Sequence, residues 1–130
     1  RHWIELVGRD SRRRALGRHT DKLTSCEDFD IAFTAIDLGL GTAVFSRLKL
    51  THLIPTRRVQ KDYLVRLAEG HGYSSVHLHS FRDGFRPAQK GPLARLRRWR
   101  YLRGLPATER AIQEAVQRGE ARAHAMLQAR

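Results

Sequence analysis

Residues 25–41 read SCEDFDIAFTAIDLGLG and contain the clearest helix boundaries in the chain. Ser25 stands three residues before Asp28, which is the hydroxyl-x-x-acid spacing of a capping box, and Glu27 and Asp28 suit the positive end of a helix dipole. Apolar side chains then recur at helical spacing, at Phe29, Ala32, Phe33 and Ile36. Gly39 follows, and glycine commonly ends a helix. The pattern predicts a helix that begins near Ser25 and ends before Gly39.

Outside this stretch the pattern is mixed. Residues 1–24 have no clear period and predict irregular structure. Two short apolar segments with interleaved β-branched residues, 42–45 and 48–54, predict strands. A second helix is expected after Thr56, interrupted near Gly70 and Gly72, and two further helices are expected over residues 93–102 and after Thr108.

The charge of the chain is high and uneven. The 130 residues have a formal net charge of +12, and residues 81–130 hold 12 basic against 4 acidic side chains. Such a surplus of cations attracts phosphates on nucleotides, nucleic acids or lipids. The single cysteine excludes an internal disulfide framework, and no apolar run is long enough to span a bilayer.

Five patterns follow one another between residues 25 and 74. They are the acidic pair Glu27-Asp28 that opens a helix, a glycine turn at 37–42 (DLGLGT), a predicted strand, the His-x-Ile-Pro segment at 52–55 (HLIP), and a helix led by Arg57-Arg58 that includes YLVRLAEGHGYS at 63–74. In this order and spacing they resemble the C-terminal half of bacterial family 2 glycosyltransferases.

The resemblance implies inverting transfer of a sugar from a nucleotide-diphosphate donor to an acceptor hydroxyl, assisted by a divalent metal, Mn²⁺ or Mg²⁺. It makes Asp28 the general base, because a carboxylate can accept the hydroxyl proton as the oxygen attacks the anomeric carbon. Glu27 would position the acceptor, and His52 would reach the metal and the diphosphate. Arg57 or Arg58 would lie near the diphosphate.

The resemblance also implies an architecture. We expect an α/β, helix-rich C-terminal part of a GT-A fold, with short strands around residues 42–54 and basic helices at the C-terminus. Residues 1–85 would be the acceptor-side portion of the transferase domain, and residues 86–130 a basic helical extension. The family's nucleotide-binding sheet does not occur in this sequence. Its one Asp-x-Asp, Asp28-Phe29-Asp30, stands at a predicted helix start and not at a strand end, so we do not assign it as the family's metal motif. We therefore expect the chain to belong to a longer bacterial enzyme of cell-surface polysaccharide synthesis, inactive as this piece alone.

Residues 90–103 contain six cations and no anion. The row Leu93, Leu96, Trp99 and Leu102 favours packing onto the domain. Contact with the inner face of the membrane, in a cytoplasmic enzyme with a carbohydrate or lipid-linked acceptor, is the alternative. Two rival functions are a small basic nucleic-acid-binding module and a non-catalytic interaction module. No helix-turn-helix, zinc or RNA-binding signature supports the former.

Overall fold

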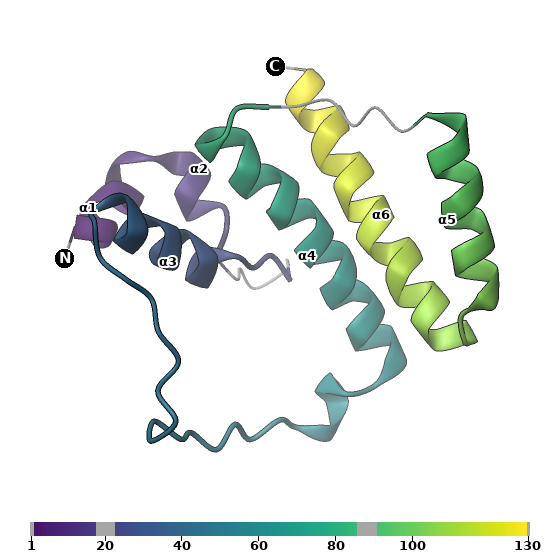
Figure 1. The fold of residues 1–130 in the computed structure, drawn as a ribbon, viewed down its shortest axis with the longest axis horizontal. Coiled ribbons are helices and arrows are strands. Elements are labelled where there is room, and N and C mark those ends of the chain that lie inside the picture. Colours follow the sequence, from purple (N-terminus) through teal and green to yellow (C-terminus); the bar gives the residue numbers. More distant parts are fainter. Residues whose placement is uncertain (1, 18–22, 86–90, 130) are drawn as a thin grey trace.

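The computed structural model describes residues 2–17, 23–85 and 91–129, and within these ranges all regular structure is helical (Figure 1). In chain order the elements are α1 (His2–Arg9), α2 (Ser11–Arg14), α3 (Glu27–Asp37), the 3₁₀-helix η1 (Thr56–Arg58), α4 (Lys61–Arg82), α5 (Pro92–Gly104) and α6 (Ala107–Gln128).

Helices α4 and α6 form the long axis of the molecule. They run side by side in the same direction, and α5 returns antiparallel beside α6 (Figure 1). Glycines allow the two long helices to approach closely. A methyl group at Gly119 would lie 2.7 Å from the Tyr73 amide nitrogen and closer still to the Glu69 carbonyl oxygen, and one at Gly72 would collide with the Val116 carbonyl. The backbones therefore pack directly against each other at these points.

A small apolar core joins the N-terminal helices to α4. Leu16, Cys26 and Leu78 are buried together, and Phe33 and Phe81 pack against them. Figure 1 shows α1, α2 and α3 gathered beside the C-terminal half of α4. The first turn of α3 therefore takes its position from α4.

A buried carboxylate, Asp30, ties four helices together. It is fully buried, and it accepts hydrogen bonds from Trp3 Nε1 at 3.0 Å, from Arg13 Nη1 at 2.7 Å and from Arg82 Nη1 at 3.4 Å. Arg13 also donates to Thr34 Oγ1 at 3.0 Å. Because burying a carboxylate without partners is costly, these hydrogen bonds and ion pairs compensate for the burial of Asp30 inside the fold.

The predicted α/β GT-A fold is wrong for this chain. The described residues contain no strand, and residues 42–54 form an irregular segment with a turn at 46–47 and no ladder partner. Their large apolar side chains remain in solvent, with Val44 fully exposed and Leu50 87% exposed. A strand exists only where a neighbour accepts and donates its backbone hydrogen bonds, and no described segment lies there to do so.

Several local predictions also need correction. Ser25 does not cap α3. The cap position is Cys26, which has a φ of 79° and makes no side-chain capping bond. Residues 2–14 are largely helical rather than irregular, and α4 continues through Gly70 and Gly72 without interruption. No helix in the described ranges is long and apolar enough to cross a membrane.

The boundary expected between residues 85 and 86 adjoins residues 86–90, which lie outside the described part of the chain, so the two-part division stays a prediction.

Candidate functional site

The acidic start of α3 is held in place by α4. The backbone N–H of Ser25 donates to Ser74 Oγ at 3.0 Å, and Gly70 leaves room for the Leu23 carbonyl to lie directly on α4. Thr24 is buried between these contacts and donates to the Gly17 carbonyl. The chain therefore enters α3 in a defined direction, and the carboxylates that follow have fixed positions.

Three carboxylates lie in the first turn of α3, and the structure separates their roles. Asp30 is occupied by its two arginines and Trp3. Asp28 is exposed, and its only recorded contact within the described residues is with the N–H of Phe29, 2.9 Å from Oδ1. Glu27 is half-buried, and its Oε2 is buried with no hydrogen-bond partner among the described residues. Asp28 is thus the carboxylate most open to a ligand, whereas Glu27 keeps one carboxylate oxygen inside the fold.

The predicted arginines line a cationic cavity at the start of α4, with a volume of about 460 Å³. Its walls are Leu23, Arg57, Arg58, Gln60, Asp62, Tyr63 and Arg66. No carboxylate in the described ranges forms an ion pair with any of the three arginines. Three guanidinium groups against one carboxylate leave the cavity positive, which suits a phosphate or diphosphate.

His52 lies apart from both groups. It is exposed in the extended segment between α3 and η1, and no described side chain forms a hydrogen bond or ion pair with it. No group of three or more His, Cys, Asp or Glu side chains gathers anywhere in the described ranges. The described residues therefore do not supply a metal site around His52, and the metal stays a prediction.

The structure does not join the predicted site residues into one cluster. No hydrogen bond or ion pair within the described ranges links Glu27 or Asp28 to His52, Arg57 or Arg58. The carboxylates lie at the start of α3, whereas Arg57 and Arg58 lie in η1, just before the start of α4 (Figure 1). Each group must therefore be tested by itself.

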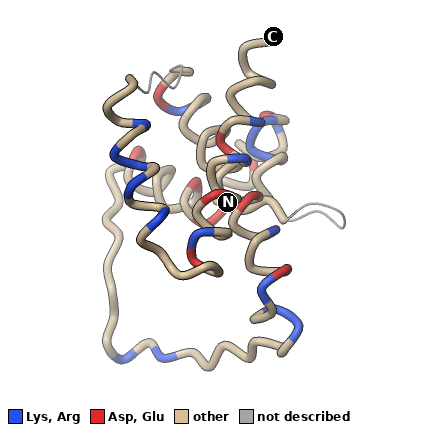
Figure 2. Tube along the Cα trace, turned by 90° about the vertical axis from the view of Figure 1, so that its right-hand side faces the viewer, with Lys and Arg blue, Asp and Glu red and all other residues tan. Residues whose placement is uncertain are grey.

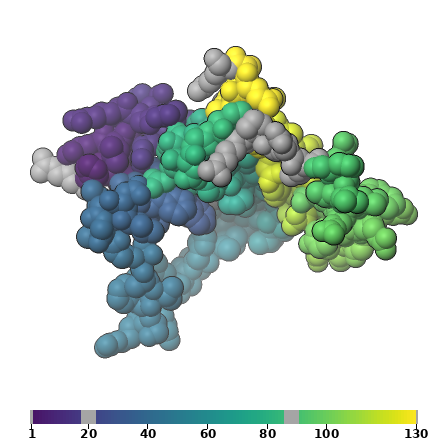
Figure 3. Space-filling view, turned by 45° about the horizontal axis from the view of Figure 1, so that its top comes forward, coloured from purple at the N-terminus to yellow at the C-terminus, as the bar shows by residue number. Residues whose placement is uncertain are grey.

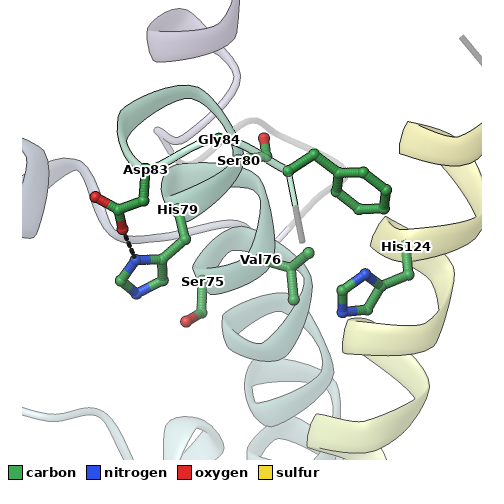
Figure 4. Close-up of a pocket in the computed structure, with 8 residues that line it drawn as sticks. Ser75, Val76, His79, Ser80, Asp83, Gly84 and His124 are labelled. Carbon is green, nitrogen blue, oxygen red and sulfur yellow. Dashed lines mark hydrogen bonds and ion pairs between the residues drawn. The ribbon is translucent and has the colours of Figure 1, made fainter. Parts of the chain in front are cut away.

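A second cavity, of about 530 Å³, lies between the C-terminal half of α4 and α6 (Figure 4). His79 Nδ1 lies 2.7 Å from Asp83 Oδ2, and both side chains are more than half exposed. From α6, His124 has a buried Nδ1 with no hydrogen-bond partner among the described residues, and its ring centroid lies 5.6 Å from that of Phe85. Sequence reasoning missed this cavity. The i, i+4 spacing of His79 and Asp83 was visible, but the approach of His124 was not.

The chain was compared with protein-family models, with curated proteins and with solved structures, and none of them matches it.

Proposed function

We propose that the chain takes part in the transfer of a sugar from a nucleotide-diphosphate donor to an acceptor hydroxyl, with Asp28 as the general base. The observation that supports this proposal best is the contrast within one turn of α3. Asp30 is locked into ion pairs, whereas Asp28, two residues earlier, is exposed to solvent. A base must reach its substrate, and of these two aspartates only Asp28 can do so.

In the proposed step, the Asp28 carboxylate accepts the proton of the acceptor hydroxyl as the hydroxyl oxygen attacks the anomeric carbon. The new glycosidic bond forms while the bond from that carbon to the donor's diphosphate breaks. The diphosphate leaves with the bonding electron pair, and attack opposite the leaving group inverts the anomeric centre. Glu27 directly precedes Asp28 and is half-buried, and in this proposal it positions the acceptor.

The arginine cavity would hold the departing diphosphate. Guanidinium groups bind phosphate oxygens in bidentate geometry and lower the cost of negative charge that develops as the donor bond breaks. Arg57, Arg58 and Arg66 are not paired with a described carboxylate, so binding an anion breaks no existing ion pair.

The exposed segment between α3 and η1 supports the proposal that the chain acts within a larger enzyme. Leu48, Leu53 and Ile54 are all more than half exposed, with Leu53 at 83%. Soluble domains rarely leave so much contiguous apolar surface in water. We further propose that this enzyme acts in the cytoplasm, at the inner face of the membrane, on a carbohydrate or lipid-linked acceptor.

The test measures nucleotide diphosphate release from a panel of UDP-, GDP- and CDP-sugars by the gene product that contains these residues. We expect Asp28→Asn to lower kcat by about 10²–10⁴-fold with little change in the donor KM. Arg57→Ala with Arg58→Ala should instead raise the donor KM. Glu109→Gln removes the same charge from an exposed site on α6 and is the control. Unchanged kcat in Asp28→Asn would refute the assignment.

A further inference from the structure

Helix α5 extends from the body of the molecule and buries none of its side chains. It lies beside α6 (Figure 1), and in the space-filling view it projects at one end (Figure 3). Arg98 donates to the Gln113 carbonyl at 3.4 Å, and Leu102 is half-buried. Most of the helix surface is therefore open to a partner.

The exposed surface of α5 is strongly cationic. The helix contains five arginines and no acidic residue, and several basic positions follow one another along its trace (Figure 2). No carboxylate in the described ranges forms an ion pair with any of the five, which are Arg95, Arg97, Arg98, Arg100 and Arg103. Arg103 lies over the Trp99 ring, 4.7 Å from its centroid. The positive charge of the helix is thus not neutralised within the fold.

Large apolar side chains share this surface with the arginines. Leu93 is 73% exposed, and Leu96, Trp99 and Tyr101 are each slightly more than half exposed. The structure does not bury the whole row against the domain, as the sequence favoured: Leu93 is largely exposed, Leu96 and Trp99 are only about half covered, and Leu102 is half-buried. A surface that exposes leucines and a tryptophan among arginines is complementary to a partner that is both anionic and apolar.

The orientation of α5 is set by Arg110 at the start of α6. Its guanidinium donates to the carbonyls of Leu102 at 2.9 Å, Leu105 at 3.1 Å and Arg103 at 3.2 Å. These carbonyls lie at the C-terminal end of α5, where the last carbonyls of a helix lack helical N–H partners; the Leu102 carbonyl also accepts from the Leu105 N–H at 3.2 Å. The connection between α5 and α6 is thereby held, so the exposed surface of α5 keeps one direction relative to the rest of the molecule.

We infer that α5 binds the surface of an anionic lipid bilayer. The arginines would pair with lipid phosphates, and Leu93, Leu96 and Trp99 would enter the boundary between headgroups and acyl chains. Arginine stems on the same face can lie along the apolar layer while their guanidinium groups reach the phosphates. This inference goes beyond sugar transfer, and either can hold without the other.

A bilayer fits this surface better than a nucleic acid does. Transfer of leucine side chains from water to the acyl layer lowers their free energy, whereas a nucleic-acid phosphate backbone provides no apolar surface for them to contact. The neighbouring α6 is mixed in charge, since Glu109 and Glu114 are exposed on it. A nucleic acid that lies across both helices would meet these carboxylates.

The experiment is sedimentation of the full chain with phosphatidylcholine vesicles, with and without phosphatidylglycerol, at about 0.1 M salt. We expect sedimentation only with the anionic vesicles, together with a blue shift of tryptophan emission that Trp99→Phe removes. Arg97→Gln with Arg100→Gln should weaken binding by about fivefold for each arginine. Leu96→Ser should weaken it while leaving the charge intact.

The control is Arg118→Gln with Arg122→Gln on α6, which removes the same charge from exposed positions and should leave vesicle binding within about twofold. Circular dichroism verifies that each variant is folded. The inference is overturned if anionic vesicles do not sediment the chain, or if the α6 control weakens binding as much as the α5 variant does. Tighter binding to random duplex DNA, unaffected by Leu96→Ser, would also overturn it and assign α5 to nucleic acid.

Discussion

The clearest test of the fold is Asp30→Asn, which removes one charge and almost no volume from the buried centre of the N-terminal helices. Arg13 and Arg82 are each 14% exposed and lie 2.7 Å and 3.4 Å from the Asp30 oxygens. After the substitution, both guanidinium groups lose their buried anion, and an amide N–H₂ replaces one acceptor oxygen. Breaking a buried ion pair from one side costs about 3–5 kcal/mol. We expect a loss of that size in the free energy of unfolding.

Urea unfolding followed by circular dichroism measures this loss. Tryptophan emission provides a second probe, because Trp3 donates directly to Asp30. Asp28→Asn is the matched control, since it makes the same chemical change two residues earlier at an exposed site and should cost less than about 1 kcal/mol. If the two variants have equal stability, Asp30 is not the buried ion-pair centre, and the contrast that supports Asp28 as the base is lost.

Three further predictions test packing and titration. Gly119→Ala should lower stability by about 2 kcal/mol, although alanine has the higher helix propensity, because the methyl group forces α4 and α6 apart by about 1 Å. Gly8→Ala, where the methyl group would meet open space, should be neutral or stabilising. Equal effects of the two substitutions in calorimetry would contradict the close crossing of α4 and α6. Burial raises the pKa of the Cys26 thiol, so at pH 8 Ellman's reagent should react far more slowly with the native chain than with the urea-unfolded chain. A rapid reaction with the native chain would contradict the burial of Cys26. Hydrogen bonds from Arg12 lower the pKa of Asp10, so the stabilisation from this pair is present above the pKa of Asp10 in the unfolded chain and is lost as pH falls through its pKa in the folded chain. Asp10→Asn retains a capping side chain. In parallel urea titrations it should therefore lower stability by less than about 1 kcal/mol at pH 7 and by nothing at low pH.

Much of the local structure was predictable from short-range patterns. The helix after Ser25 ends before Gly39, whose φ is +75°, and the basic helix expected over residues 93–102 is α5. The last helix was predicted to follow Thr108 as its cap, and it begins two residues earlier, at Ala107 with Pro106 in the cap position. Helical periodicity and helix-ending glycines act over a few residues, so they can be read without knowledge of the fold.

The candidate site was predictable only in part. The exposed Asp28, the half-buried Glu27 and the arginines just before α4 were singled out in the sequence, and their functional roles stay predictions. The buried role of Asp30 was not, because Arg13 and Arg82 lie 17 and 52 residues away along the chain. The contact of His124 with the cavity beside His79 also joins distant segments.

The sequence by itself therefore determined where α3 and the basic helix lie and where the positive charge gathers. The tertiary structure decided which acid is buried and which is exposed, why Gly119 is a contact point between helices, and whether residues 42–54 form strands. The physical reason is the distance along the chain over which each kind of interaction acts. Helix hydrogen bonds close within four residues, whereas ion pairs, helix crossings and β ladders depend on which distant segments meet. For residues 42–54, no described segment meets them, so their apolar side chains remain in water.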